Sequence, residues 1–121
     1  MSKGAAANTA AFNFQDNFST RVQFGLLGND SFTISCSPDG STFNNGLVIS
    51  PSGSASVGGT FTLASFTVSG LPSAVLAGAG AMAWVTDATQ TFTSANFGAT
   101  VTGGGTHGAR VVSNGTNWIV A

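Results

Sequence analysis

Charged side chains are scarce in this sequence. Only 6% of the 121 residues are charged, against about a quarter in an ordinary soluble domain, and Glu is absent. The net charge of -1 excludes the clustered Lys and Arg with which proteins replace the counterions of nucleic acid. Because Glu, Lys, Arg and Gln normally coat solvated helices, their scarcity favours strands over helices.

Cysteine and long apolar runs are also lacking. The single cysteine, Cys36, cannot form a disulfide within the chain, so stability has to come from packing or from oligomerisation. No apolar run approaches the length of a membrane span, and no charged segment followed by an apolar one marks a signal peptide. The sequence therefore predicts synthesis in the cytosol and no insertion into a membrane.

Small polar residues and aromatic residues take the place of charge. The chain has ten Phe and two Trp but no Tyr, and Ser, Thr, Asn and Gly supply its polarity. This composition predicts an all-β protein of antiparallel hairpins or a meander, either a small β-sandwich-like fold or an intertwined trimer. In a chain of this length, so much Phe is expected in a core or in contacts between subunits.

Three segments follow from the pattern along the chain. Residues 1–49 alternate apolar and polar side chains between turn signals and predict an N-terminal β meander. Residues 50–59, SPSGSASVGG, predict a linker or long loop, and residues 60–121 predict a C-terminal β module that forms a tip. Within the meander, Cys36 is in phase with Phe32 and Ile34, which predicts a small residue of the core.

The end of the chain contains the clearest local signal. Asn114-Gly115 lies between two β-prone runs and is typical of a two-residue type I′ turn. This turn predicts three cross-strand pairs: Ser113 with Thr116, Val111 with Trp118, and Ala109 with Val120. The opposite face would carry Val112 and Ile119. Because both faces are apolar, we expect a second covering layer, which another subunit could provide.

Two parts of the sequence resemble bacteriophage proteins. FGLLGNDSFTISCSPDGSTFNNGLVIS is similar to an element of phage tail and host-attachment proteins, including a domain of unknown function. SGLPSAVLAGAGAMAWVTDA, followed by GATVTGGGTHGARVVSNGTNWIVA, looks like the C-terminal module of many phage tail fibres. The resemblance implies a virion structural protein, usually trimeric, that takes part in attachment to a glycan or protein of the bacterial surface. The alternative is a head, collar or tail decoration or connector that binds other virion proteins.

Loop residues are the expected receptor contacts, because binding function concentrates in loops carried by a rigid scaffold. The predicted contacts are Thr89, Gln90, Thr93, Asn96, Gly104, Thr106 and His107. The predicted residues of the core or of a subunit contact are Val111, Val112, Trp118 and Ile119. The strand phase of Trp84 also favours packing in the core over stacking on a sugar ring.

Catalytic chemistry has little support in the sequence. The four Asp residues fall at predicted turns or strand ends, so a glycan depolymerase, which needs two carboxylates across a glycosidic bond, is less favoured. Cys36 and His107 could form a nucleophile and base, but Cys36 is predicted to be in the core. His107 is expected in a loop, where three copies on a trimer axis could bind a metal. The sequence predicts no enzyme and no required cofactor.

Overall fold

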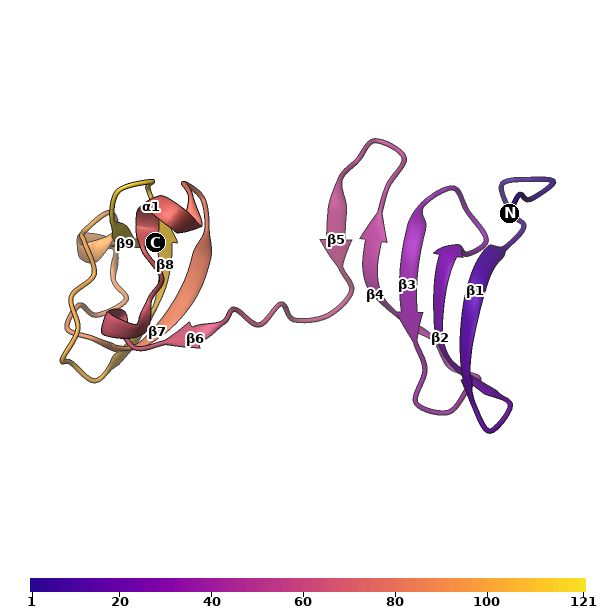
Figure 1. The fold of residues 1–121 in the computed structure, drawn as a ribbon, viewed down its shortest axis with the longest axis horizontal. Coiled ribbons are helices and arrows are strands. Elements are labelled where there is room, and N and C mark those ends of the chain that lie inside the picture. Colours follow the sequence, from indigo (N-terminus) through magenta and orange to yellow (C-terminus); the bar gives the residue numbers. More distant parts are fainter. The chain divides into compact units, whose positions relative to one another are not determined.

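The structure, a computed structural model, describes all 121 residues and has an all-β fold. The predicted class of antiparallel hairpins and a meander is confirmed. The chain divides into two compact units, Met1–Phe61 and Thr62–Ala121. Each unit is built on one sheet, and helix is limited to one short α-helix and two 3-10 turns (Figure 1).

The first unit is a meander of five antiparallel strands that neighbour one another in chain order (Figure 1). The strands are β1 (Ala10–Asp16), β2 (Ser19–Leu26), β3 (Phe32–Cys36), β4 (Asn44–Ile49) and β5 (Ala55–Val57). In the registers of β1, β2 and β3, Phe12 lies opposite Phe24, and Phe24 lies opposite Ile34. Directly opposed residues share a face, so the alternation of the sequence places the apolar side chains together.

The predicted linker at residues 50–59 is wrong over part of its length, because β5 lies within it. The Gly53 amide donates to the Ser50 carbonyl at 2.9 Å and the Ser50 amide donates to the Ser54 carbonyl at 2.9 Å, which closes a tight turn. The chain then pairs with β4, where Leu47 lies opposite Val57. Three small residues, Ala55, Ser56 and Val57, thus form an edge strand here, because the edge of β4 supplies its hydrogen bonds.

The turn between β3 and β4 is built around Asp39. Its Oδ1 accepts hydrogen bonds from the backbone amides of Ser41 at 2.8 Å and Thr42 at 2.7 Å. The Ser37 hydroxyl accepts one from the amide of Gly40 at 2.8 Å, and Gly40 has the positive φ of 82° that this turn requires. The backbone hydrogen bonds from Thr42 and then Ser41, and that from the Ser37 hydroxyl, lower the pKa of Asp39 to about 2.

The second unit folds around a four-stranded sheet in the order β6-β7-β8-β9. Its elements are β6 (Ser65–Phe66), the 3-10 helix η1 (Val68–Gly70), α1 (Ala74–Ala77), β7 (Met82–Ala88), the 3-10 helix η2 (Ser94–Asn96), β8 (His107–Ser113) and β9 (Trp118–Val120). β6 is parallel to β7, and the other pairs are antiparallel. All nine buried apolar residues of the protein lie in this unit, on one face of the sheet and in the segments that cover it.

Side chains of the sheet form hydrogen bonds to the covering segments around η1 and α1. The Trp118 indole Nε1 donates to the carbonyl of Pro72 at 2.8 Å, and the Ser113 hydroxyl donates to the carbonyl of Ala74 at 2.8 Å. The backbone amide of Val68 donates to Asp87 Oδ1 at 2.7 Å. These bonds satisfy polar groups beside the core, so this unit supplies its own second layer.

The final hairpin has a different register from the predicted one. Val111 pairs with Val120, Val112 with Ile119, and Ser113 with Trp118. The loop has four residues rather than two, because Asn114 Oδ1 accepts hydrogen bonds from the amides of Thr116 at 2.9 Å and Asn117 at 2.8 Å. A shift by two residues keeps each side chain on its predicted face. Val111 and Trp118 are therefore buried on one face, and Val112 and Ile119 are half-buried on the other.

We expect the turn at Asp39 to weaken in acid. The pKa of Asp39 is lowered from 3.8 to about 2 in the folded state, so the stabilisation is complete above about pH 4 and is lost as the pH falls towards 2. Carboxyl ¹³C NMR should show this titration near pH 2, with amide protection of Ser41 and Thr42 falling over the same range. Asp39→Asn should remove the pH step, and a midpoint near 4 in the wild type would contradict the assignment.

Candidate functional site

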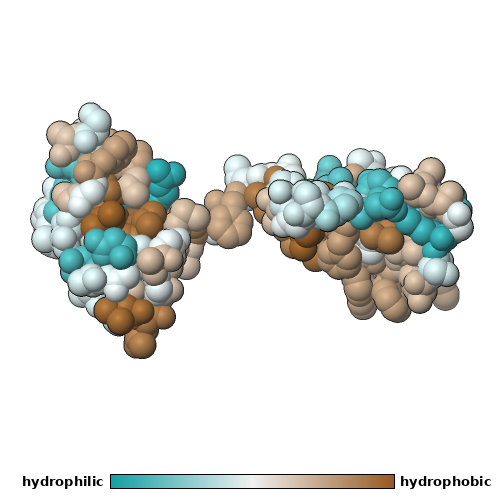
Figure 2. Space-filling view, turned by 90° about the horizontal axis from the view of Figure 1, so that it is seen from above, coloured by the Kyte–Doolittle hydropathy of each residue, from teal (hydrophilic) through white to brown (hydrophobic).

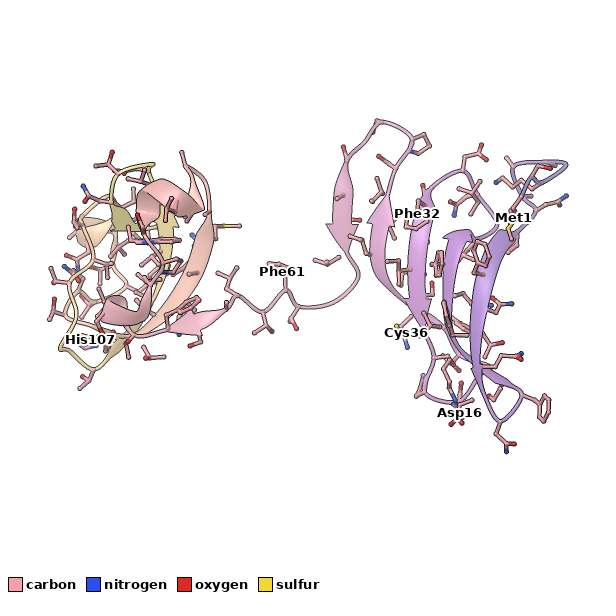
Figure 3. The ribbon with its side chains drawn as sticks, in the orientation of Figure 1. Met1, Asp16, Phe32, Cys36, Phe61 and His107 are labelled. Atoms are coloured by element: carbon pink, nitrogen blue, oxygen red, sulfur yellow. The ribbon has the colours of Figure 1, made fainter.

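The first unit exposes a face of stacked aromatic rings. The Phe24 ring centroid lies 5.3 Å from that of Phe12, 5.7 Å from that of Phe14 and 6.3 Å from that of Phe32. The rings belong to three adjacent strands, and Phe12, Phe14 and Phe32 are 58%, 57% and 39% exposed. We call this surface the phenylalanine face. A pocket of about 200 Å³ lies on it, lined in part by Met1, Phe12 and Phe32. Met1 and Phe32 are labelled in Figure 3.

The opposite face of this sheet carries the buried residues of the first unit, and all three bear hydroxyl groups. Thr33, Ser35 and Ser37 are buried, while no apolar residue of this unit is. The small Ser35 lies between Gln23 of β2 and Asn45 of β4, and its hydroxyl donates to Asn45 Oδ1 at 2.7 Å. The aromatic face of the five-stranded sheet is thus without a second layer in the single chain.

The prediction of a buried Cys36 is wrong, because its side chain is exposed. Its phase with Phe32 and Ile34 is confirmed, since Cys36 lies opposite Val22 in the register of the apolar face. That face is uncovered, so residues in phase with it reach solvent. The nucleophile and base pair considered from the sequence therefore combines residues of different units, since Cys36 lies in the first unit and His107 in the second.

Two predicted receptor contacts hold their own loop together. The Gln90 amide donates from Nε2 to the Thr100 carbonyl at 3.0 Å and to the Thr102 hydroxyl at 2.8 Å. Its Oε1 accepts from the Thr102 amide at 3.0 Å. Asn96 Nδ2 donates to the carbonyl of Thr91 at 2.8 Å. Gln90 and Asn96 therefore fix the conformation of residues 89–102, and their amide groups are largely used in doing so.

The other predicted contacts lie on the surface of the second unit. Thr89, Thr93, Gly104, Thr106 and His107 are all exposed. Thr89 bonds to Thr102 through both its backbone amide and its hydroxyl. His107 is not in a loop as predicted: it begins β8 and lies opposite Ala88, because the β7–β8 ladder continues past an irregularity after Val85 (Figure 3).

A set of residues that the sequence did not bring together lies on the outer face of the second sheet. Trp84 of β7 lies directly opposite Arg110 of β8. The Arg110 guanidinium carbon lies 6.0 Å from the Phe92 ring centroid, and that centroid lies 5.4 Å from the centroid of Phe97. We call these four residues the aromatic-arginine strip.

Trp84 is 40% exposed, so its predicted place in the core is wrong. Its neighbours Ala83 and Val85 are buried. Successive side chains of a strand point to opposite faces, so the sequence alone places Trp84 and Val85 on opposite faces of the sheet. No sequence signal placed Phe92 beside Arg110, because that contact depends on how the long loop after β7 folds back.

Three of the four Asp side chains have partners within the protein. Asp30 forms an ion pair with Lys3 at 2.7 Å, and Asp39 and Asp87 accept backbone hydrogen bonds. No group of three or more His, Cys, Asp or Glu side chains is placed to bind a metal ion. No helix of the protein has the length and apolar character needed to cross a bilayer. A trimer-axis metal at His107 stays a prediction.

Comparisons with protein families, with curated protein sequences and with solved structures find no match to this chain. Arguments about function therefore rest on the phenylalanine face, the aromatic-arginine strip and the loops beside it.

Gln90→Ala should loosen the loop that carries Phe92. The substitution removes four side-chain hydrogen bonds, including the one that Oε1 accepts from the Thr102 amide. We therefore expect exchange of the Thr102 amide to quicken by at least about fivefold, with the sheet intact. Hydrogen exchange by NMR measures this directly. Thr106→Ala is the matched control, because that exposed residue lies in the neighbouring loop. Equal exchange in both variants would show that Gln90 does not hold the loop.

Proposed function

We propose that the protein is a homo-oligomeric phage virion protein, similar to a tail-fibre tip, that takes part in attachment to the bacterial surface. The resemblance of both halves to tail-fibre modules supports this proposal, as does the low charge of a β-rich chain. The observation that carries the proposal is the phenylalanine face. An exposed aromatic sheet face is characteristic of a surface that associates.

A second copy of the chain is the proposed cover of the phenylalanine face. The first unit buries no apolar residue by itself, so its face needs a cover wherever the protein is folded. The face carries no charged side chain between its turns, so copies can meet without repulsion. With strands about 4.8 Å apart and about five residues long, each face spans about 400 Å². Joining two faces covers about 800 Å² in total, which is below the roughly 1,200 Å² at which specific interfaces begin, so an assembly of more than two copies is favoured.

A trimer suits the dimensions of the sheet. Three five-stranded sheets arranged as a triangle, each about 20–24 Å wide, place the common axis about 6 Å from each sheet. That distance is comparable with the reach of a Phe side chain. The stacked rings of three copies would then fill the centre as a shared core, while the polar Thr33 and Ser35 face outward.

The second unit is suited to the binding role within this proposal. It covers its own core, so it does not depend on assembly to fold, and its loops are cross-braced by Gln90 and Asn96. A rigid scaffold with exposed loops is a common arrangement for recognition. The alternative is a head, collar or tail connector that binds other virion proteins, and it is favoured only by the same apolar face.

Replacing Phe12 and Phe14 by Ser should dissociate the oligomer. Both rings are more than half exposed in the single chain, so the substitutions cost the isolated subunit little, yet they raise the dissociation constant by at least about 100-fold. Light scattering with size-exclusion chromatography gives the mass. Phe18→Asn is the matched control, because Phe18 is 94% exposed at the β1–β2 turn and has a positive φ that Asn tolerates. A monomeric wild type at micromolar concentration would contradict the proposal.

Attachment predicts that the purified full chain binds bacterial cells without any other virion component. Fluorescently labelled protein should adhere to some members of a panel of bacterial strains, and unlabelled protein should compete. A protein that binds purified phage particles but none of the cells is a connector, which would overturn the attachment role and favour the alternative.

A further inference from the structure

The aromatic-arginine strip crosses the outer face of the second sheet as a row. Trp84 and Arg110 are opposed on adjacent strands and so share a face. The Arg110 side chain extends over the next strand and reaches Phe92. Its Nε donates to the main-chain oxygen of Ala121, the last residue of the sequence, at 2.9 Å. The backbone amide of Gly98 donates to the carbonyl of Val120 in β9 at 2.8 Å, so the segment that carries Phe97 lies beside β9. Phe97 therefore continues the row. The row spans about three strand spacings, or about 14 Å.

The rings of this row are exposed but held in place. Trp84, Phe92 and Phe97 are 40%, 49% and 53% exposed. A Cβ on Gly108 would lie 2.6 Å from Trp84 Cζ2, so the indole rests directly against the backbone of β8. The loop that carries Phe92 is braced by the Gln90 side chain. Such a surface loses little conformational entropy when a ligand binds.

The charge of the row points to an anionic ligand. Arg110 is the only Lys or Arg of the second unit. The one carboxylate side chain of that unit, Asp87, accepts a hydrogen bond from the Val68 amide. While Nε of Arg110 is bonded to Ala121, its two terminal nitrogens have no hydrogen-bond partner in the protein. A guanidinium with both terminal nitrogens free can donate two parallel hydrogen bonds to a carboxylate or a phosphate.

We propose that the aromatic-arginine strip binds a saccharide that carries a carboxylate or phosphate group. The flat C–H faces of sugar rings stack on the Trp and Phe rings, and the acidic group pairs with Arg110. A single cation is too little for a nucleic acid backbone, whose binding needs several phosphate contacts. The inference rests on the proposed attachment role and specifies the chemistry that this role would recognise.

The test uses the full chain on an array of uronic acid, phosphorylated and neutral oligosaccharides, with each uronic acid also present as its methyl ester. The wild type should bind acidic sugars, and esterification should weaken the binding to uronic acids by at least about tenfold. Arg110→Gln should cause the same loss, Arg110→Lys a smaller one, and Phe92→Ser a loss with acidic and neutral sugars alike. Arg21→Gln, which removes the same charge from the first unit, should leave binding unchanged. Comparison of the uronic acid and phosphate arms identifies the acidic group.

Quenching of tryptophan emission provides an independent readout, because both Trp residues lie in the second unit and Trp84 belongs to the strip. Equal binding of acids and esters, or full binding by Arg110→Gln with native emission, would overturn the proposal. Binding of polyglutamate but of no saccharide would identify a peptide ligand and overturn it as well. If the protein adheres to cells but binds no acidic saccharide, the saccharide proposal for the strip is overturned and the attachment proposal is not. If the protein adheres to no strain, the result counts against attachment itself.

Discussion

A β-sheet with one apolar face needs a second layer on that face, and the two halves of this protein meet this requirement differently. In the second unit, α1, η1 and the long loops cover one face of the sheet, and Val85, Val111 and Val120 are fully buried. In the first unit, the five strands lie in one layer, as the ribbon shows (Figure 1). The rings of Phe12, Phe14 and Phe32 are exposed on that layer. Apolar surface is visible on both units in the space-filling view (Figure 2).

This difference explains why the low charge of the sequence matters. A surface rich in Lys and Glu would oppose contact between copies, whereas a charge-poor surface permits strands and faces to meet. Because the chain has so few charged side chains, the contacts of each one are informative. Lys3 and Asp30 form an ion pair, Asp39 organises a turn, and Arg110 lies among aromatic rings.

The candidate binding surface combines a sheet with a loop folded onto it. The sheet positions Trp84 and Arg110, and the loop after β7 brings Phe92 and Phe97 beside them. The sequence predicts Gln90 as a receptor contact because it lies in a polar loop, but its side-chain amide forms hydrogen bonds within that loop. Polar side chains in loops often form hydrogen bonds to nearby backbone groups. Exposed aromatic rings beside them are then the better candidates for contact with a ligand.

The sequence by itself determined the all-β class, the position of most turns and which side chains share a face. Alternation with a period of two is a local property of the extended backbone, so it placed Phe12 with Phe24 and Val111 with Trp118 even where the hairpin register differed by two residues. Only the tertiary structure decided which faces are covered. Cys36 and Trp84 are exposed because burial depends on a second layer contributed by distant segments, and no local pattern encodes whether that layer is present. For the same reason the meeting of Arg110 with Phe92, 18 residues apart in the sequence, follows from the path of a loop across the sheet.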